Sequence, residues 1–140
     1  MIVNRRGLVL ALERADAACA WQLPQGGLEE SEEPLAGALR EVQEETGIAP
    51  DLLELLDTYP GPLAYELPPE FRKTKTGRGQ VQYWFLFRFL GSDAEIAAGG
   101  GEFRDWKWIG FDALLASAAR FREPVYRRLA ERFQPYLAPA

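Results

Sequence analysis

The sequence predicts an α+β fold with a mixed central sheet, and three observations lead to this prediction. The chain has 140 residues, of which 47% are hydrophobic, and this suits one compact domain with its own core. Strand-length apolar runs and helical patterns follow one another without the regular strand–helix–strand repeat of a parallel sheet. Neither internal repeats nor a linker divides the chain, so we expect a single domain over residues 1–140.

Three short strands are expected before residue 24. The chain opens with an apolar strand, turns at "NRRG" (4–7) and continues as the strand "LVLALER" (8–14). The segment "DAACA" (16–20) is expected to be a loop, and "WQL" (21–23) a short strand. A turn at "PQGG" and an acidic loop then lead to the first helix.

This first helix is expected between Pro34 and Gly47. Proline is tolerated at a helix start, where its fixed φ and missing N–H cost little, and glycine commonly follows the last helical turn. Between the two lies a largely apolar stripe at helical spacing, made of Leu35, Ala38, Leu39, Val42 and Thr46.

The rest of the chain is expected to supply more strands and two further helices. "LLELLDTY" (52–59) is expected to be a strand, and residues 60–79 a long loop rich in Pro and Gly. A buried strand, two shorter strands and two amphipathic helices should follow. Their expected positions are "QVQYWFLFRFL" (80–90), "DAEI" (93–96), "FRDWKWIG" (103–110), 111–121 and 123–137.

Composition excludes several classes of site. The chain has no histidine, which rules out Ser–His and Cys–His nucleophile pairs and histidine metal ligands. Cys19 is the only cysteine, so no intrachain disulfide can form and a cytoplasmic location is expected. A net charge of −5 argues against a general nucleic-acid coat protein or a DNA-duplex binder. No apolar run is long enough to predict a membrane span.

Negative charge is concentrated on the first helix. Glu41, Glu44 and Glu45 are three and four residues apart, so their carboxylates converge on one side of the helix. Like charges at this spacing repel by a few tenths of a kcal/mol per pair, about 0.2–0.5. Several oxygen ligands on one rigid element suit a hard cation such as Mg²⁺ or Mn²⁺. A solvated acidic helix face is the alternative interpretation.

The segment 26–48, "GGLEESEEPLAGALREVQEETGI", resembles the Nudix box. All nine specified positions of that motif match: Gly26, Glu32, Arg40, Glu41, Val42, Glu44, Glu45, Gly47 and Ile48. The resemblance implies a Nudix-type α/β/α sandwich. It further implies Glu41, Glu44 and Glu45 as metal ligands and catalytic residues, with Glu32 as a supporting or outer ligand. Gly26 would let the backbone approach the metal, and Arg40 would hold a neighbouring glutamate.

Further segments resemble one branch of the Nudix superfamily, which contains bacterial RNA 5′-pyrophosphohydrolases and plant-type diadenosine tetraphosphate hydrolases. They follow in the expected order and cover most of the chain. These segments are "WQLPQGG" (21–27), "YELP" (65–68), "GQVQYWFLF" (79–87), "EFRDWKWI" (102–109) and "FREPVYRRL" (121–129).

The branch resemblance also implies individual roles. Glu102 matches an extra catalytic carboxylate that ligates another metal or acts as general base. Phe121 matches a residue that stacks on a nucleobase, Arg122 one that contacts phosphate, and Tyr65 one near the phosphate chain. The loop cations are candidate phosphate contacts: Arg72, Lys73, Lys75 and Arg78. The alternatives are a surface charge for Glu102, a core position for Phe121, a half-buried structural role for Tyr65 and unspecific loop charges. The tryptophans expected in the core are Trp84, Trp106 and Trp108.

Two features depart from the branch pattern. The chain starts inside the expected first strand, so either the start site is wrong or that strand is shortened. Arg14–Ala15 stands where the branch often has a basic pair. Both departures remove positive charge, which leaves a mononucleoside or dinucleoside substrate open beside RNA.

The expected activity is metal-dependent hydrolysis of phosphoanhydride bonds in nucleoside-diphosphate-linked compounds. Dinucleoside polyphosphates and triphosphorylated RNA 5′ ends are the two favoured substrates. The alternatives are a nucleoside triphosphate pyrophosphohydrolase of nucleotide-pool sanitation and a non-catalytic nucleotide-sensing module. We expect a monomer or a weak homodimer without membrane contact.

Overall fold

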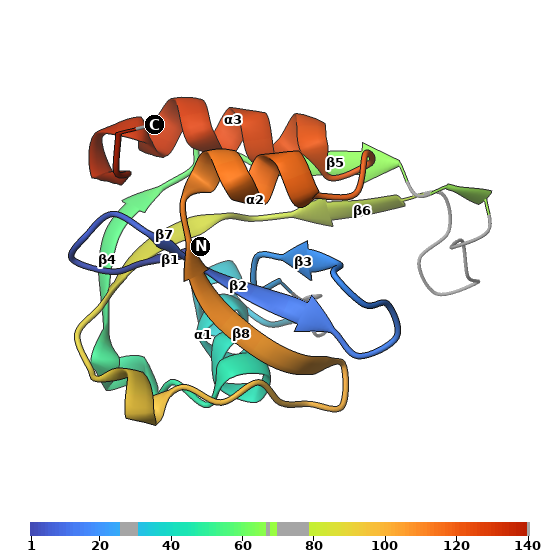
Figure 1. Cartoon of the computed structure of the whole chain (residues 1–140). Coiled ribbons are helices and arrows are strands. Elements are labelled where there is room, and N and C mark those ends of the chain that lie inside the picture. The colour runs from blue at the N-terminus through green and yellow to red at the C-terminus, as the bar shows by residue number, and fades with distance from the viewer. Residues whose placement is uncertain (26–30, 67, 70–78, 140) are drawn as a thin grey trace.

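The centre of the fold is a six-stranded sheet of mixed direction (Figure 1). The computed structural model describes residues 1–25, 31–66, 68–69 and 79–139, without the side chains of Tyr65 and Gln80. The sheet contains β1 (Ile2–Val3), β2 (Val9–Arg14), β3 (Trp21–Gln22), β4 (Leu53–Thr58), β7 (Phe85–Phe89) and β8 (Phe103–Ile109). Strand β1 runs parallel to β7, and the other pairings within this sheet are antiparallel.

Helices cover both faces of the sheet (Figure 1). On one face, Val9 and Ala11 of β2 join a buried cluster with residues of α2 (Phe111–Ser117) and α3 (Glu123–Phe133). On the other face, Leu10 of β2 shares a second cluster with Val42 of α1 (Pro34–Thr46). This alternation follows from the two-residue period of a strand. The predicted α/β/α sandwich with a mixed sheet is therefore confirmed.

The first helix matches its prediction at both ends. Pro34 is the first residue of α1, and Gly47 follows the helix in the left-handed region with φ +72°. The Gly47 N–H donates to the Gln43 carbonyl oxygen, which closes the last turn. Val42 and Thr46 of the predicted apolar stripe are buried.

Two predictions in the middle of the chain were wrong. Residues 60–79 are not a loop throughout, because β5 (Leu63–Glu66) pairs antiparallel with β6 (Gly79–Gln82) in a separate two-stranded sheet. For the same reason the single strand expected over 80–90 is two strands, since β6 pairs with β5 whereas β7 pairs with β1 and β4. The break lies at Tyr83 and Trp84.

The strand expected over 93–96 is a 3₁₀ turn, Asp93–Glu95. Ser92 and Glu95 form a capping box: the Ser92 N–H donates to Glu95 Oε1 at 3.1 Å, and the Ser92 side-chain oxygen accepts from the Glu95 N–H. The Glu95 N–H also donates to the Ser92 carbonyl at 3.0 Å. These local hydrogen bonds stabilise a turn and leave no extended segment for a sheet to pair with.

The two C-terminal helices are present but shorter than predicted. Helix α2 ends at Ser117, whose hydroxyl donates to the Leu114 carbonyl at 3.0 Å. Helix α3 ends at Phe133 and continues as a 3₁₀ turn, Gln134–Tyr136, because Pro135 has no N–H to extend the α-helix. Along the described part of the chain, no helix has both the length and the apolar character needed to cross a bilayer.

Candidate active site

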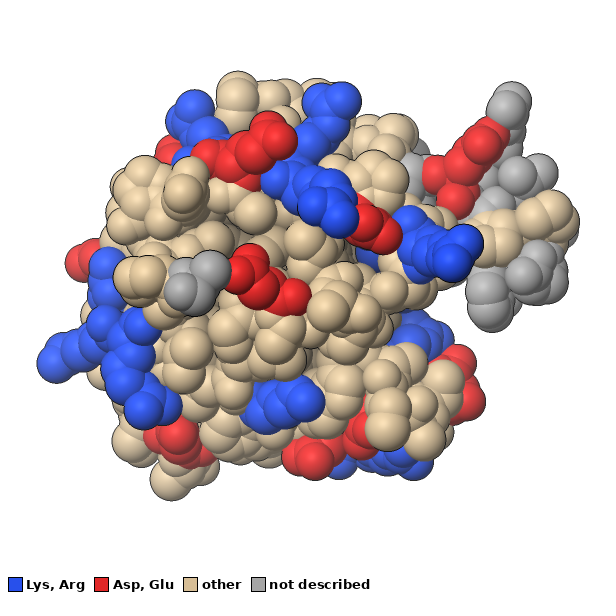
Figure 2. Space-filling view, turned by 45° about the horizontal axis from the view of Figure 1, so that its top comes forward, with Lys and Arg blue, Asp and Glu red and all other residues tan. Residues whose placement is uncertain are grey.

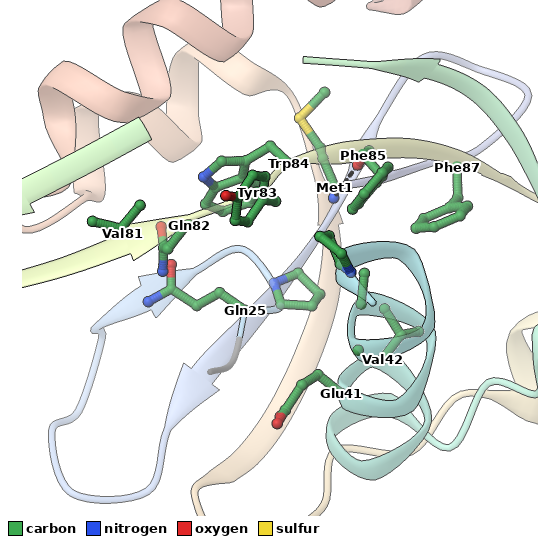
Figure 3. A pocket seen from close by; sticks show the side chains of 14 residues that line it. Met1, Gln25, Glu41, Val42, Val81, Gln82, Tyr83, Trp84, Phe85 and Phe87 are labelled. Atoms are coloured by element: carbon green, nitrogen blue, oxygen red, sulfur yellow. Dashed lines mark hydrogen bonds between the residues drawn. The ribbon is translucent and has the colours of Figure 1, made fainter. Parts of the chain in front are cut away.

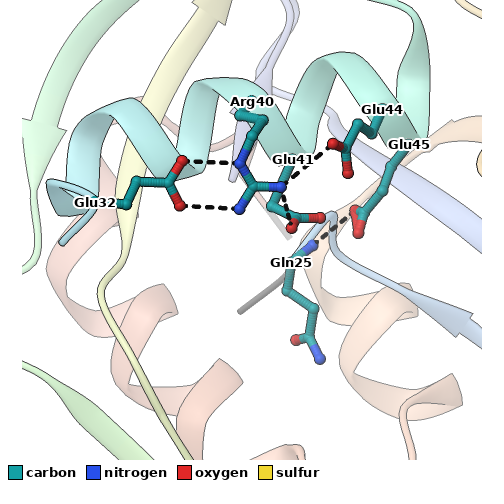
Figure 4. Close-up of polar contacts among 6 residues, drawn as sticks. All are labelled: Gln25, Glu32, Arg40, Glu41, Glu44 and Glu45. Carbon is teal, nitrogen blue, oxygen red and sulfur yellow. Dashed lines mark hydrogen bonds and ion pairs between the residues drawn. The ribbon is translucent and has the colours of Figure 1, made fainter. Parts of the chain in front are cut away.

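The acidic side of α1 is organised by Arg40 (Figure 4). Its guanidinium donates two parallel hydrogen bonds to Glu32, from Nε at 2.8 Å and from Nη2 at 2.9 Å. Its Nη1 donates to Glu41 at 2.8 Å and to Glu44 at 3.3 Å. These bonds, with Glu32 first among them, raise the pKa of Arg40, so its charge is permanent. Arg40 therefore contacts three glutamates, and its role in holding them for the reaction stays a prediction.

Glu45 is the most buried of the helix carboxylates, with 3% of its surface exposed. Its Oε2 accepts a hydrogen bond from the backbone N–H of Gln25 at 3.0 Å (Figure 4). Burial, followed by the negative charges of Glu41, Glu102 and Glu44, raises the pKa of Glu45 to about 9. The charged form of a buried carboxylate among like charges is disfavoured when no cation is present. A bound cation would stabilise that charged form, so such a carboxylate is a good metal ligand.

Glu41 and Glu44 differ in exposure. The Glu41 side chain is 19% exposed, and burial raises its pKa against the opposing effect of Arg40. The Glu44 side chain is 56% exposed and faces solvent. The three helix carboxylates therefore run from buried to exposed, with Arg40 binding two of them.

Glu102 joins this group from a different element. It precedes β8 and its side chain is exposed, but its charge contributes to the raised pKa values of both Glu41 and Glu45. The loop before it is attached to the end of α1, because the Ala97 and Gly99 N–H groups donate to the carbonyls of Thr46 and Glu45, each at 2.9 Å. The fold thus brings Glu102 towards the helix carboxylates, across more than fifty residues of sequence.

The side chains of these carboxylates are not arranged as a complete metal-binding site. Within the described residues, no group of three or more acidic side chains is arranged to hold an ion directly. Arg40 accounts for much of this, since it holds one oxygen of Glu41 and one of Glu44. The donor set is nevertheless all oxygen and strongly anionic, which fits a hard divalent cation.

A hollow with a cavity volume of about 220 Å³ lies along the edge strand β3. Arg14 and Arg122 both line it, and the Arg122 guanidinium lies 4.5 Å from the centre of the Phe121 ring. Nearby, the Lys107 ammonium lies 4.0 Å from the Trp21 ring centre. Phe121 is half-buried and packs against the core, so it contacts both the core and Arg122.

Arg14, one of the two arginines that line this hollow, is paired with neighbouring polar side chains. Arg14 donates to Asp16 at 2.8 and 2.9 Å and to Gln22 at 3.3 Å. In Figure 2, Lys and Arg side chains are interspersed with Asp and Glu rather than forming a continuous basic patch.

Several of the predicted site residues lie outside the residues that the structure describes. One contact in the site was not predicted. Gly26 and the loop cations Arg72, Lys73, Lys75 and Arg78 fall outside the described residues, as does the side chain of Tyr65. Trp84 is buried, and Trp106 and Trp108 are partly buried against the α1-side cluster. Sequence reasoning did not identify Gln25 as a partner of Glu45. Its place directly before the Gly-rich turn was the available signal.

Comparison with known proteins assigns the family. The NUDIX domain model matches residues 1–129 of this chain. An RNA pyrophosphohydrolase of Cereibacter sphaeroides (strain KD131 / KCTC 12085) is 42% identical over 144 residues, which cover 99% of this chain and 89% of that protein. Nudix hydrolase 26, chloroplastic, of Arabidopsis thaliana is 36% identical over 147 residues, covering 97% of this chain and 67% of that protein.

A solved structure agrees at the level of the fold. The E. coli dihydroneopterin triphosphate pyrophosphohydrolase superposes with a TM-score of 0.76 at 23% sequence identity. The match covers 94% of this chain and 90% of that chain. At this identity the likeness concerns the architecture alone.

Proposed function

This chain belongs to the NUDIX domain family, and from that premise we propose that it is a divalent-metal-dependent pyrophosphohydrolase acting on the triphosphate of RNA 5′ ends. The observation that carries the choice of substrate is the 42% identity to an RNA pyrophosphohydrolase over 99% of this chain. Hydrolysis of a phosphoanhydride bond is the reaction common to this assignment and to dinucleoside polyphosphate cleavage.

Glu41, Glu44 and Glu45 are proposed to hold the cation, with Glu32 in a supporting position. The raised pKa of Glu45 supports this role, because a neighbouring positive charge would restore the anionic form that burial disfavours. When bound, Mg²⁺ or Mn²⁺ would polarise the phosphate oxygens as a Lewis acid. Arg40 keeps Glu41 and Glu44 close together through the two hydrogen bonds from its Nη1.

Glu102 is proposed to accept the proton of the attacking water. It is exposed and outside the helix, yet close enough to Glu41 and Glu45 to affect both pKa values. In the reaction a bond forms between the water oxygen and phosphorus, and the phosphoanhydride P–O bond breaks. The water proton passes to the Glu102 carboxylate, and the leaving phosphate takes the electron pair.

Substrate contacts are proposed along the β3 hollow. Arg122 supplies a fixed positive charge and Phe121 an aromatic face, and they lie beside each other. Tyr65 and the loop cations, Arg72, Lys73, Lys75 and Arg78, are proposed as further phosphate contacts on the sequence pattern alone.

A substrate panel tests this proposal. At equal Mg²⁺, and again at equal Mn²⁺, kcat/KM would be measured for a 5′-triphosphate RNA oligomer, diadenosine tetraphosphate and deoxynucleoside triphosphates. The proposal expects the RNA oligomer to lead by at least about tenfold, a difference of about 1.4 kcal/mol in transition-state binding. Preference for deoxynucleoside triphosphates would favour nucleotide-pool sanitation instead. Binding without metal-dependent product would favour a sensing module.

A further inference from the structure

Another hollow lies between α1 and the junction of β6 with β7 (Figure 3). Its cavity volume is about 60 Å³, and it is partly open to solvent. Gly37 and Ala38 of α1 form part of one wall, and Glu41 of the acidic group lies at its edge. The hollow therefore adjoins the candidate active site and shares Glu41 with it.

Its polar side chains are buried with unmet hydrogen-bonding capacity. Gln82 is 6% exposed and Trp84 is 3% exposed. Among the described residues, three of their buried atoms have no hydrogen-bond partner: Nε2 and Oε1 of Gln82 and Nε1 of Trp84. Buried polar groups in folded proteins nearly always have partners, so two residues that line one hollow and carry three such atoms point to a ligand.

Apart from Gln25 and Glu41, the rest of the lining is largely apolar, and it includes two exposed side chains. Phe85 and Phe87 are buried along the wall. Val81 is 66% exposed and Tyr83 is 45% exposed, although both are large apolar or aromatic residues. An apolar hollow with a few converging polar groups is the usual composition of a small-molecule site.

The chemistry of these groups selects the occupant. The Gln82 amide offers one acceptor and a donor group, whereas the Trp84 indole only donates. A phosphate at neutral pH mainly accepts hydrogen bonds and favours cationic partners, and no Lys or Arg is found among the described lining residues. A lipid chain would leave all three atoms unpaired. A nucleobase offers a flat apolar face together with donors and acceptors along its edge.

We infer that this hollow binds the nucleobase of the first nucleotide of the substrate, with Gln82 and Trp84 hydrogen-bonding to the base edge. Glu41 at the rim places the phosphates of that nucleotide beside the acidic group of α1. The inference rests on the proposed function, since it names a base subsite for the same substrate. Gln82 is then a specificity residue rather than a catalytic one.

Kinetics with a matched pair of substrates test the inference. One is a 5′-triphosphate RNA oligomer, and the other is the same oligomer with an abasic first nucleotide. Gln82→Leu is expected to raise KM for the first about tenfold, with kcat nearly unchanged, and to leave KM for the abasic oligomer unaltered. Gln134→Leu makes the same chemical change at an exposed residue outside the hollow and should affect neither substrate. Equal KM values for wild type and Gln82→Leu on both substrates would overturn the inference.

A binding experiment separates this inference from the proposed function. The Trp84 indole N–H resonance, assigned with Trp84→Phe, is followed by NMR during titration with GMP, AMP or ribose 5-phosphate. A saturable shift with either nucleotide but not with ribose 5-phosphate is expected, and Gln82→Leu should weaken it. No shift with either nucleotide, or an indole N–H already protected from exchange before addition, would contradict the inference. Absence of triphosphate hydrolysis would overturn the proposed function. The NMR titration would still show whether the hollow binds a nucleobase, because it does not depend on hydrolysis.

Discussion

Arg40 and Glu32 are joined by two parallel hydrogen bonds, Nε to Oε2 at 2.8 Å and Nη2 to Oε1 at 2.9 Å. The pair ties the segment before α1 to the middle of the helix, with side-chain exposures of 25% and 15%. Because Nη1 of the same guanidinium also binds Glu41, Arg40 fixes one of the proposed ligands relative to the segment that leads into the helix.

Arg40→Lys should destabilise the protein although it keeps the positive charge. An ammonium group cannot reproduce the planar fork that binds Glu32 and Glu41 at once, so partly buried carboxylates lose partners. We expect the free energy of unfolding to fall by about 1–2 kcal/mol in urea denaturation without metal. Arg128→Lys, at an exposed position on α3, is the matched control. Equal stability of both variants would show that the fork contributes nothing.

Glu45 should make the metal-free protein less stable as pH rises. Its pKa is raised from 4.5 to about 9 in the folded state, so the folded protein binds more protons than the unfolded chain between these values. The stabilising effect of the neutral form is complete below about pH 4.5 and is lost progressively up to pH 9. We expect a loss on the order of 2–4 kcal/mol over this range, measured by urea denaturation in EDTA.

Glu45→Gln is the control for that titration, because the amide resembles the neutral acid at every pH. The variant should be more stable than wild type at pH 8 and should lose most of the dependence on pH. If wild type and Glu45→Gln showed the same slope between pH 5 and 9, Glu45 would not be the titrating group. The variant would then still report on the role of Glu45 in catalysis.

Tyr126 should link helix α3 to the segment that leads into the active site. Its side chain is fully buried, and its hydroxyl accepts a hydrogen bond from the Leu23 N–H at 3.0 Å. Tyr126→Phe leaves that backbone donor without its partner, and we expect about 1–2 kcal/mol less stability in thermal or urea unfolding. Tyr136→Phe, whose hydroxyl makes only a 3.5 Å contact with the Leu56 carbonyl, should change stability by less than about 0.5 kcal/mol. Similar losses in both variants would contradict this assignment.

Local signals were sufficient to predict α1. Pro34 and Gly47 act within their own turns of the backbone, and the apolar stripe depends only on spacing along the helix. The positions of the box glutamates on that helix followed directly. Their differing environments did not, because the burial of Glu45 depends on Gln25, which approaches from a separate segment.

The β5–β6 pair could not be predicted from local pattern. Each strand has four residues, too few for alternation to be distinctive, and each is stabilised by its pairing with the other. The approach of Glu102 to α1 is also non-local, since it requires β8 to pair with β2 and the preceding loop to bond to the helix end. Only resemblance to the Nudix family indicated this carboxylate in advance.

The central claim is that the carboxylates of α1 hold the cation used in phosphoanhydride hydrolysis. The most direct measurement is kcat with saturating Mg²⁺ for wild type, Glu44→Gln, Glu45→Gln and the matched control Glu33→Gln. Glu33 is exposed at the start of the same helix, and its side chain makes no capping hydrogen bond. We predict losses of about a hundredfold or more for Glu44→Gln and Glu45→Gln, with near wild-type rates for Glu33→Gln and folded protein throughout. Wild-type turnover by both Glu44→Gln and Glu45→Gln would contradict the claim.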